Sequence, residues 1–506
     1  MLTSTIILIP LVAAMIVSFT PKDAAAQIGK IAVAGTIMSF ALSIGLLAMF
    51  DKSDPEMQFV DSFAWIPMLN INYQVGVDGI SLLLVVLTTF LSVIAVILSL
   101  NQKDSLKNFI VLMLILESGI LGVFVALDTI LFYVFWELML VPTYFLIGLW
   151  GEGRRVYATT KFVIYTMVGS LLMLVAIVAL TMVHFSATQN MTFDIRLLLH
   201  THIDPDTQLW MFLFFFLAFA IKIPIFPLHS WLPHAYVASP IPALVLLTGA
   251  MSKAGAYGLI RFCLPLFPQA VERTGLVIGA MAAIGIVYGA WIAIAQRDLK
   301  ALVAWSSVSH LGFIALGIFA LNGQGLEGSV LQMVNHGIIA SALFVIVGIL
   351  EQKLGTRNLD DLKGLKKNMP VLYGMFMLIT LAALGLPGLN GFVGEFLILL
   401  GVWSSKLLSS YSIIYVLMGG LAIVFASIYM LYMFQGAMQE KNEKFPATLM
   451  DINCREFGLL LPACMLVVLI GLFPKPLIDR ISPAIGHMLA NEKTVNLPSA
   501  NKEGHH

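Results

Sequence analysis

The stretch from Phe219 to Pro233 reads FAIKIPIFPLHSWLP and follows the apolar run LWMFLFFFLA. A lysine, Lys222, therefore stands inside a strongly apolar segment, and Pro224 and Pro227 follow it closely. Proline removes a backbone donor and frees an earlier carbonyl, so a helix here must break. The stretch predicts a broken helix with a charge at its break.

The composition indicates a polytopic membrane protein. Of the 506 residues, 59% are hydrophobic and only 11% are charged, which is about half the charged share of a soluble domain. The formal net charge is zero, so it suggests neither nucleic acid nor an anionic surface as a partner. The three cysteines, Cys263, Cys454 and Cys464, lack CxxC or Cys/His spacing. We therefore expect no iron–sulfur cluster, structural zinc or other cofactor in this chain.

Apolar runs of membrane-spanning length recur along the chain. A helical span needs about 20 apolar residues, and the count predicts an all-α polytopic membrane protein with about 14 transmembrane helices. No Lys or Arg precedes the first run, so we expect an uncleaved first span rather than a signal peptide. The runs begin near residues 2, 28, 78, 108, 129, 161, 208, 242, 274, 298, 328, 370, 411 and 455.

Basic residues are divided unevenly between alternate loops. One side carries most of them, including Lys103 and Lys300, whereas the opposite side carries few, including Arg261. The positive-inside rule places the basic side in the cytoplasm and both termini in the periplasm. Two lysines, Lys222 and Lys253, belong to neither set, because both lie within spans.

Titratable residues fall at similar depth in six different spans. Counting the helical rise from the nearest helix end places them roughly 12 to 18 Å deep. A charge in the membrane costs at least about 2.5 to 3.5 kcal/mol, so such residues are normally paired and functional. The six are Glu137, Lys222, Lys253, His310, His336 and Glu395. A second carboxylate, Glu117, is a further candidate on the same path.

Two spans are interrupted, and their positions indicate an internal repeat. Pro224 and Pro227 break helix 7, and Pro387 and Gly388 break helix 12 within LGLPGLNG. Each broken helix is the fourth of five, in helices 4–8 and 9–13, so the second set enters from the opposite side as an inverted repeat. The predicted division is 1–107 for helices 1–3, 108–265 and 266–437 for the two five-helix repeats, and 438–506 for helix 14 and a polar tail.

These residue types suit proton transfer. Burial lowers the pKa of a lysine and a nearby carboxylate raises it, so a buried lysine with a movable carboxylate is a switchable proton site. Glu137 is the predicted partner of Lys222. His310 and His336 can relay protons near neutral pH, and Glu395 would be the terminal donor or acceptor.

Each residue also has a structural interpretation. A single buried charge such as Lys222 can join two helices, and a lone buried histidine can be a satisfied core residue. Lys253 lies among small residues in GAMSKAGAYGL, which permit close packing without a transport role. Glu117 fits a local hydrogen-bond partner as well as a path residue. Asp78 and Asp128 lie at helix ends, where we expect them to act as caps.

Seven segments between about Asp78 and Pro476 resemble a known family. It is the family of antiporter-like M subunits of proton-pumping NADH:quinone oxidoreductase, respiratory complex I. The segments are FWELMLVPTYFLIGLWG, KFVIYT, IKIPIFPLHSWLP, KAGAYGLIRF, QRDLKALVAWSSVSHLGF, QMVNHGI and GLPGLNGFVGEFLIL.

The resemblance implies proton-translocating roles for the same six residues, with His310 and His336 on the axis that connects the lysines to Glu395. Related chains L and N and the cation/proton antiporter subunits usually carry lysine at position 395, so a glutamate favours chain M. After helix 7 the family often reads WLPDAH, whereas this chain reads WLPHAYVASPIP. No role in proton uptake is therefore carried over to that loop.

The resemblance also implies the setting. The chain would move protons from cytoplasm to periplasm across a bacterial inner membrane, driven by NADH, FMN, iron–sulfur clusters and quinone in partner subunits. Its expected partners are chains L and N, including the lateral helix of chain L, and phospholipids, with no nucleic acid. The alternatives are a subunit of a multisubunit cation/proton antiporter, a subunit of a membrane-bound hydrogenase, and a scaffold that does not transport.

Overall fold

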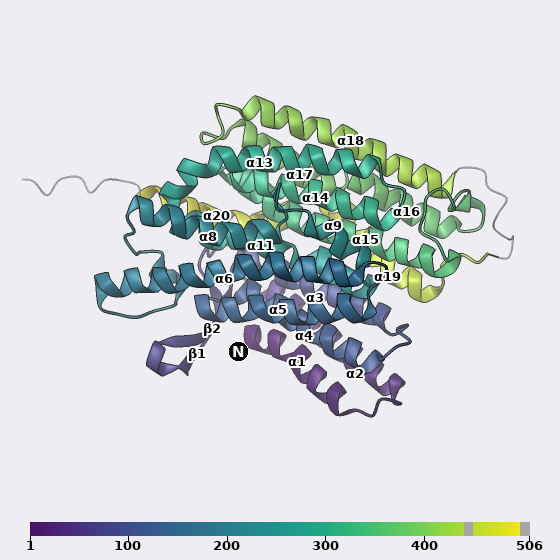
Figure 1. The fold of residues 1–506 in the computed structure, drawn as a ribbon, viewed down its shortest axis with the longest axis horizontal. Helices are drawn as coiled ribbons and strands as arrows, with labels where there is room; N and C mark the ends of the chain where they lie inside the picture. The colour runs from purple at the N-terminus through teal and green to yellow at the C-terminus, as the bar shows by residue number, and fades with distance from the viewer. Residues whose placement is uncertain (440–448, 496–506) are drawn as a thin grey trace, which may run out of the picture.

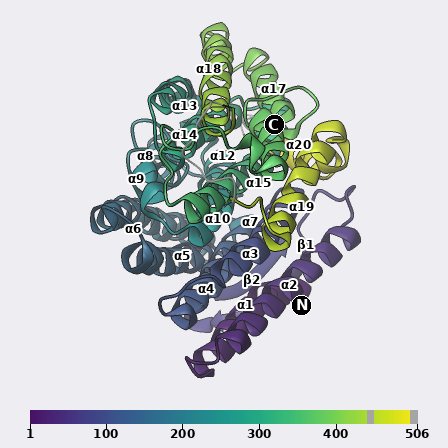
Figure 2. The ribbon, with the colours of Figure 1, turned by 90° about the vertical axis from the view of Figure 1, so that its right-hand side faces the viewer.

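The computed structural model describes residues 1–439 and 449–495. It consists of long helices that run side by side along one axis (Figure 1). Seen from one end, the N-terminal helices lie on one flank and α18 lies on the other (Figure 2). The helices are α1 (Leu2–Phe19), α2 (Ala25–Met49), α3 (Gly79–Ser99), α4 (Leu106–Val125), α5 (Thr129–Trp150), α6 (Arg155–Thr188), α7 (Ile195–Leu198), α8 (Pro205–Lys222), α9 (Trp231–Ala238), α10 (Ile241–Leu246), α11 (Lys253–Gly258), α12 (Leu264–Leu266), α13 (Pro268–Ile294), α14 (Leu299–Ile318), α15 (Gly323–Leu354), α16 (Pro370–Ala383), α17 (Asn390–Trp403), α18 (Ser412–Met438), α19 (Cys454–Leu472) and α20 (Lys475–Val495). Two 3₁₀ turns, η1 (Pro67–Leu69) and η4 (Leu365–Lys367), and two π-helical turns, η2 (Leu247–Met251) and η3 (Leu259–Cys263), complete the helical structure.

Twelve helical stretches of the described chain are long and apolar enough to cross a membrane. The runs predicted near residues 208 and 370 are not among the twelve, and each is divided into two helices. These are α8 with α9, and α16 with α17.

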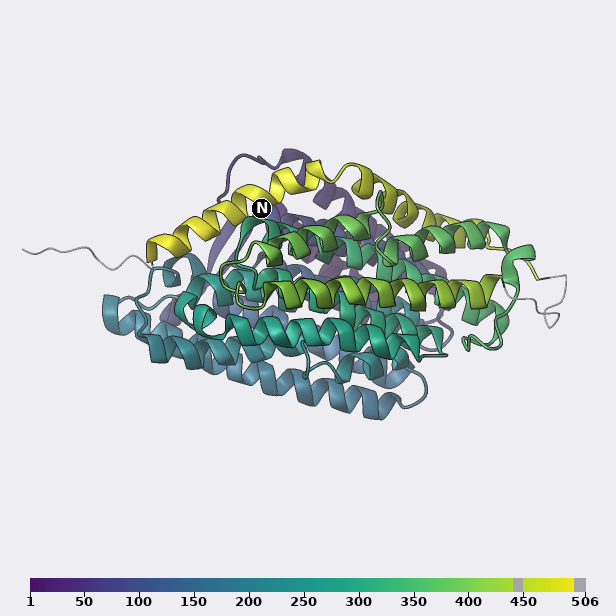
Figure 3. The same cartoon turned by 90° about the horizontal axis from the view of Figure 1, so that it is seen from above.

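The interior and the surface of the bundle are made by different helices. Almost all of α14, α15 and the stretch from Ile241 to Leu266 is buried. By contrast, α6 and α18 lie on the outside (Figures 2 and 3) and expose rows of apolar side chains. Exposed apolar rows of this length suit contact with lipid tails.

The prediction of an all-α chain was wrong for the segment between α2 and α3. There β1 (Gln58–Ile66) and β2 (Ile71–Val77) form an antiparallel hairpin. The strand QFVDSFAWI is rich in aromatic and β-branched residues, which favour strands, but it is too short and too polar to register as a span. Asp61 joins the hairpin to α1, because its carboxylate accepts hydrogen bonds from the backbone and hydroxyl of Ser4.

The C-terminal region is more helical than predicted. After α19, α20 packs against α3 and α15, and a Cβ on Gly79 would overlap the carbonyl oxygen of Arg480. The end of the predicted polar tail, residues 496–506, and the basic residues Lys441 and Lys444 lie outside the described residues.

Aspartates begin several helices, as expected for Asp78 and Asp128. The Asp78 carboxylate accepts from the backbone N–H groups of Ile80 and Ser81, and Ser81 completes a capping box. Asp128 caps α5 in the same way, and Asp298 caps α14. The capping prediction is confirmed, because a side-chain oxygen satisfies amides that the helix leaves without partners.

The interruption between α8 and α9 is stabilised by substitute hydrogen bonds. Because Pro224 has no N–H, the carbonyl of Ala220 accepts instead from the N–H of Ile225, at 2.9 Å. The carbonyl of Ile221, which thereby loses its normal partner, accepts from the indole Nε1 of Trp231 at 2.8 Å. The break therefore leaves neither carbonyl unsatisfied, as an apolar medium requires.

The interruption between α16 and α17 uses glycine. Gly385 and Gly388 have φ of +78° and +93°, a conformation that only glycine adopts without strain. The carbonyl of Asn390, at the start of α17, accepts from the side-chain amide of Asn335 on α15 at 2.7 Å. The break is thus held by the helix that packs beside it.

Arg261 was assigned to a loop, but it lies in η3, within the helical stretch that ends at Leu266. Its guanidinium is 2.5 Å from the carboxylate of Asp78. Burial alone would raise the pKa of the Asp78 carboxyl, but Arg261 beside it and the capping N–H of Ser81 hold that pKa below its ordinary value. The ion pair therefore fastens the start of α3 to the end of this stretch.

Replacing Asp78 with Asn should destabilise the protein. The amide can still cap α3, but the arginine loses its only carboxylate partner in the described chain, and unpairing a buried ion pair costs about 3 to 5 kcal/mol. We expect a lower Tm of the detergent-solubilised protein than for the control Asp128→Asn, which changes a cap that pairs with no cation in the described structure. Equal Tm values for the two variants would contradict the role given to Arg261.

Candidate functional site

Four of the six predicted residues form a continuous row in the middle of the bundle. The Lys253 ammonium is 2.8 Å from Nδ1 of His336. The rings of His336 and His310 have their centroids 5.6 Å apart. Nδ1 of His310 is in turn 2.7 Å from Oε1 of Glu395. Lysine, two imidazoles and carboxylate therefore follow one another across α11, α15, α14 and α17.

The row is enclosed by protein. Lys253 is wholly buried, and Glu395 and His336 are 4% and 3% exposed. Charges in such a medium interact strongly, because little solvent screens them. A change of protonation at one member therefore changes the electrostatic energy of the next member.

A π-helical turn orients Lys253. In η2 the N–H of Ser252 bonds to the carbonyl of Leu247 instead of to that of Thr248. The freed Thr248 carbonyl accepts from the Lys253 ammonium and from the Ser252 hydroxyl. A π turn of this kind often marks a functional site, and here it supplies a ligand for a buried cation.

When Lys253 is charged and Glu395 is ionised, their hydrogen bonds specify the tautomers of the two histidines. An ammonium can only donate, so Nδ1 of His336 accepts from Lys253 and its proton lies on Nε2. A carboxylate can only accept, so Nδ1–H of His310 donates to Glu395. Each ring thus uses Nδ1 for its partner outside the pair and keeps Nε2 for exchange with other groups.

Glu395 has a second donor that was not among the predicted site residues. The side-chain amide of Gln332, on α15, donates to the same oxygen, Oε1, at 3.2 Å. Gln332 precedes His336 by four residues, so both side chains lie on one face of the helix. That spacing, within QMVNH, was the signal available in the sequence.

Lys222 lies apart from the row, in an aromatic site. Its ammonium is 5.2 Å from the ring centroid of Trp136 and 5.6 Å from that of Phe162, both within the range of cation–π interaction. No described carboxylate lies within ion-pairing distance of it. Glu137, the predicted partner, follows Trp136 on α5, is half-buried, and acts on Lys222 electrostatically rather than by direct contact.

The helices of the two buried lysines touch at backbone distance. A Cβ on Gly255 of α11 would lie 2.6 Å from the carbonyl oxygen of Phe219 and 3.0 Å from Cβ of Lys222. A Cβ on Gly258 would lie 2.4 Å from the Phe219 ring. These contacts bring α8 against the helix of Lys253, although no hydrogen bond between the two lysines is present in the described structure.

Glu117 makes no hydrogen bond to any member of the row within the described structure. It is wholly buried on α4, and neither carboxylate oxygen has a hydrogen-bond partner among the described residues. The role of Glu117 on the path stays a prediction.

Comparison with known proteins shows which family the chain resembles. A family model described as "NADH:quinone oxidoreductase/Mrp antiporter, TM" matches residues 126–426, which contain all six residues but not Glu117. The chain is 37% identical to NADH-quinone oxidoreductase subunit M of Rhodobacter capsulatus over 505 residues, covering 97% of this chain and 96% of the relative. It is 42% identical to the subunit M of Pseudomonas aeruginosa over 448 residues, with coverage of 87% and 86%.

A solved structure has the same fold. A chain of respiratory complex I from Thermus thermophilus with bound NADH superposes with a TM-score of 0.86, at 29% sequence identity. The match covers 97% of this chain and 100% of that one.

Substituting Gly255 with Ala should disturb the contact between α8 and α11. The new methyl group would press on the Phe219 backbone, and overpacking of this kind costs about 1 to 3 kcal/mol. The control is Gly374→Ala on α16, where no atom lies within 4 Å of the new Cβ. We expect a lower Tm for the Gly255 variant only; a Tm as high as that of the control would show that the contact is not tight.

Proposed function

Because the chain belongs to the NADH:quinone oxidoreductase/Mrp antiporter family, and within it to the M subunits of NADH-quinone oxidoreductase, we propose that it translocates protons as a membrane-arm subunit of that complex. The observation that carries the proposal is the buried row of Lys253, His336, His310 and Glu395. A structural scaffold does not need four titratable groups joined in sequence.

The tautomers support one direction of relay through the row. Lys253 gives a proton to Nδ1 of His336, which releases its own proton from Nε2. His310 takes a proton on Nε2, directly or over one water, and gives the Nδ1 proton to Glu395. One proton then rests on Glu395, and Lys253 is left as a neutral amine that must be reloaded.

Reloading would involve the first half of the chain. Lys222 and Glu137 are coupled across space without a direct bond, so a small displacement of Glu137 changes the interaction energy. Each unit of pKa change is worth about 1.4 kcal/mol. We propose that neighbouring subunits displace Glu137, and that the proton released from Lys222 reaches Lys253 across the contact at Gly255.

The direction of transport and the setting belong to the same proposal. The basic loops support a cytoplasmic assignment for their side, with both termini periplasmic in a bacterial inner membrane. Protons would leave through Glu395 into the periplasm. Residues 108–265 and 266–437 would form the inverted five-helix repeats, within about 14 helices.

Partner subunits would supply the driving energy. NADH, FMN, iron–sulfur clusters and quinone would be held there, while this chain holds no cofactor. Chains L and N, with the lateral helix of chain L, are the proposed neighbours, and phospholipids would cover the apolar faces of α6 and α18.

Replacing Lys222 with Ala tests the proposal in membrane vesicles that contain the assembled complex. We expect the variant to assemble and to oxidise NADH with an artificial acceptor. Quinone-coupled proton pumping should fall at least about tenfold, because loss of an acid–base group typically costs a factor of about 10² to 10⁴. Glu395→Gln, which keeps a hydrogen bond to His310 but no charge, should behave likewise.

Lys406→Ala is the matched control, since it removes the same charge at an exposed position. Loss of assembly in the Lys222 and Glu395 variants alone would support a scaffold. Proton movement driven by a sodium gradient, with none driven by NADH, would support the antiporter. Normal pumping by both variants would refute the assigned roles.

A further inference from the structure

One buried lysine lies outside the row and takes no part in the proposed proton relay. Lys300 is the second residue of α14. The charge pattern of the sequence predicts it in a basic loop, but its side chain is wholly buried. Its ammonium makes no hydrogen bond within the described structure. The carboxylate that faces it belongs to Glu152, whose Oε2 lies 3.9 Å away.

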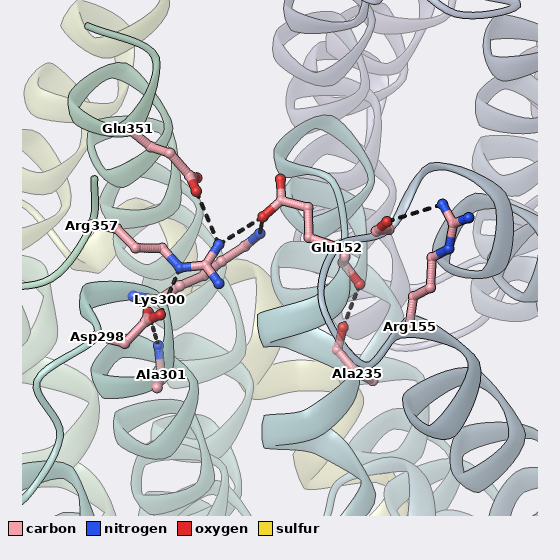
Figure 4. Close-up of polar contacts among 10 residues, drawn as sticks. Glu152, Arg155, Ala235, Asp298, Lys300, Ala301, Glu351 and Arg357 are labelled. Atoms are coloured by element: carbon pink, nitrogen blue, oxygen red, sulfur yellow. Dashed lines mark hydrogen bonds and ion pairs between the residues drawn. The ribbon is translucent and has the colours of Figure 1, made fainter. Parts of the chain in front are cut away.

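Glu152 is shared between two cations (Figure 4). The same Oε2 accepts from NH1 of Arg357 at 2.8 Å. Arg357 also binds Asp298 at 2.6 Å and Glu351 at 3.0 Å. Burial alone would lower the pKa of the Arg357 guanidinium, but these carboxylates raise it above its ordinary value, so Arg357 stays charged.

Lys300 therefore depends on Glu152 more than Arg357 does. If Glu152 takes up a proton, Arg357 keeps Asp298 and Glu351, whereas Lys300 loses the carboxylate that faces it. Asp298 and Glu351 also act on Lys300 electrostatically, but Arg357 binds both of these carboxylates directly. A buried ammonium that loses its nearest counter-charge is strongly disfavoured. Protonation of Glu152 must favour release of a proton from Lys300.

The backbone holds Glu152 between the ends of α5 and α9. Its N–H donates to the carbonyl of Ala238, the last residue of α9, at 2.8 Å. A Cβ on Gly151 would lie 2.1 Å from the Ile147 carbonyl oxygen and 2.8 Å from that of Ala238, so only glycine fits before Glu152. Arg155 closes the turn by donating to the carbonyl of Leu149 at 2.7 Å.

Glu152 is also exposed to solvent, on the side of the protein that carries the basic loops. Its side chain is half exposed, and it lines a cavity of about 630 Å³ together with Asn101, Gln102, Gln352 and Asn453. Other charged groups around the cavity are Lys103, Arg455 and Glu456. Protons from the adjoining aqueous phase can therefore reach Glu152, but not the buried Lys300 directly.

We propose that Glu152 and Lys300 form a second carboxylate–lysine proton site. This site takes up protons at the end of the bundle that carries the basic loops and passes them to His310 and Glu395. The proposal rests on the proposed function and adds an uptake site to it. Lys300 and His310 lie on the same helix, ten residues apart, which is about 15 Å.

The proton balance of the site is simple. The Glu152 carboxylate takes one proton from the aqueous phase and becomes neutral. Lys300 then releases one proton inward along α14, where the buried hydroxyls of Ser306 and Ser307 follow. The resulting amine takes the proton from Glu152, which restores carboxylate and ammonium, so one proton has moved inward.

The test uses Glu152→Gln, Lys300→Met and Lys300→Arg in vesicles with the assembled complex, and rates are expressed per assembled complex. Without the pair, protons must reach α14 directly from the aqueous phase, so the pumping rate depends more strongly on the bulk proton concentration. We expect the alkaline limb of the pumping rate to move about one unit toward lower pH in all three variants. NADH oxidation with an artificial acceptor should stay unchanged.

Lys300→Arg separates proton transfer from a structural role. Arginine keeps the positive charge but cannot release its proton at accessible pH. A purely structural cation would be rescued by arginine, so a wild-type pH profile in this variant would overturn the proposal.

Glu456→Gln is the matched control. Glu456 lines the same cavity and pairs with Lys353 at 3.1 Å, and glutamine preserves its capping box at the start of α19. We expect its profile to match wild type. If wild type pumps and the pH profile of Glu152→Gln is unshifted, only the uptake site is refuted. If wild type shows no redox-driven pumping, the proposed function itself is refuted.

Discussion

Titratable groups inside a membrane protein must find partners within the protein, and the rest of this structure depends on how Lys253 does so. Its ammonium is wholly buried and binds the Thr248 carbonyl and Nδ1 of His336. His310 lies beside His336 and binds Glu395, so the row of polar groups continues across the bundle. A charge costs several kcal/mol in such surroundings unless it is compensated. The same bonds that compensate it also connect it to its neighbours.

Irregular backbone recurs wherever a polar group must be satisfied at depth. The π turn of η2 frees the Thr248 carbonyl for a lysine, and the break after α8 leaves the Ile221 carbonyl to the indole of Trp231. At the break before α17, the Asn390 carbonyl accepts from Asn335. In the first two places a side chain binds a carbonyl that the irregular backbone has freed, and in the third a side chain ties the start of α17 to α15. Departures from regular helix are therefore sites of polar chemistry here, because lipid cannot satisfy them.

The buried lysines differ in what surrounds them. Lys253 has hydrogen-bond acceptors, whereas Lys222 has aromatic faces and a carboxylate that acts from a distance. A cation held by π faces is stabilised less than one held by direct hydrogen bonds to a partner. Lys222 is thus the more sensitive of the two to movement of Glu137. Lys300, with one carboxylate at 3.9 Å, stands between these cases.

The sequence by itself determined the helical membrane architecture, the starts of most spans, the caps at Asp78 and Asp128, and the six titratable positions within the spans. Those features depend on local hydropathy and on the chemistry of single residues, which a sequence states directly. The order of contacts was decided only by tertiary structure, because Lys253 meets His336 across 83 positions and His310 meets Glu395 across 85. The same reason explains the errors at Arg261 and Lys300. The sequence predicts both as loop charges, but Lys300 is buried and Arg261 is largely covered by parts of the chain far away in sequence. Packing between distant helices leaves no periodic signal in the sequence of either one.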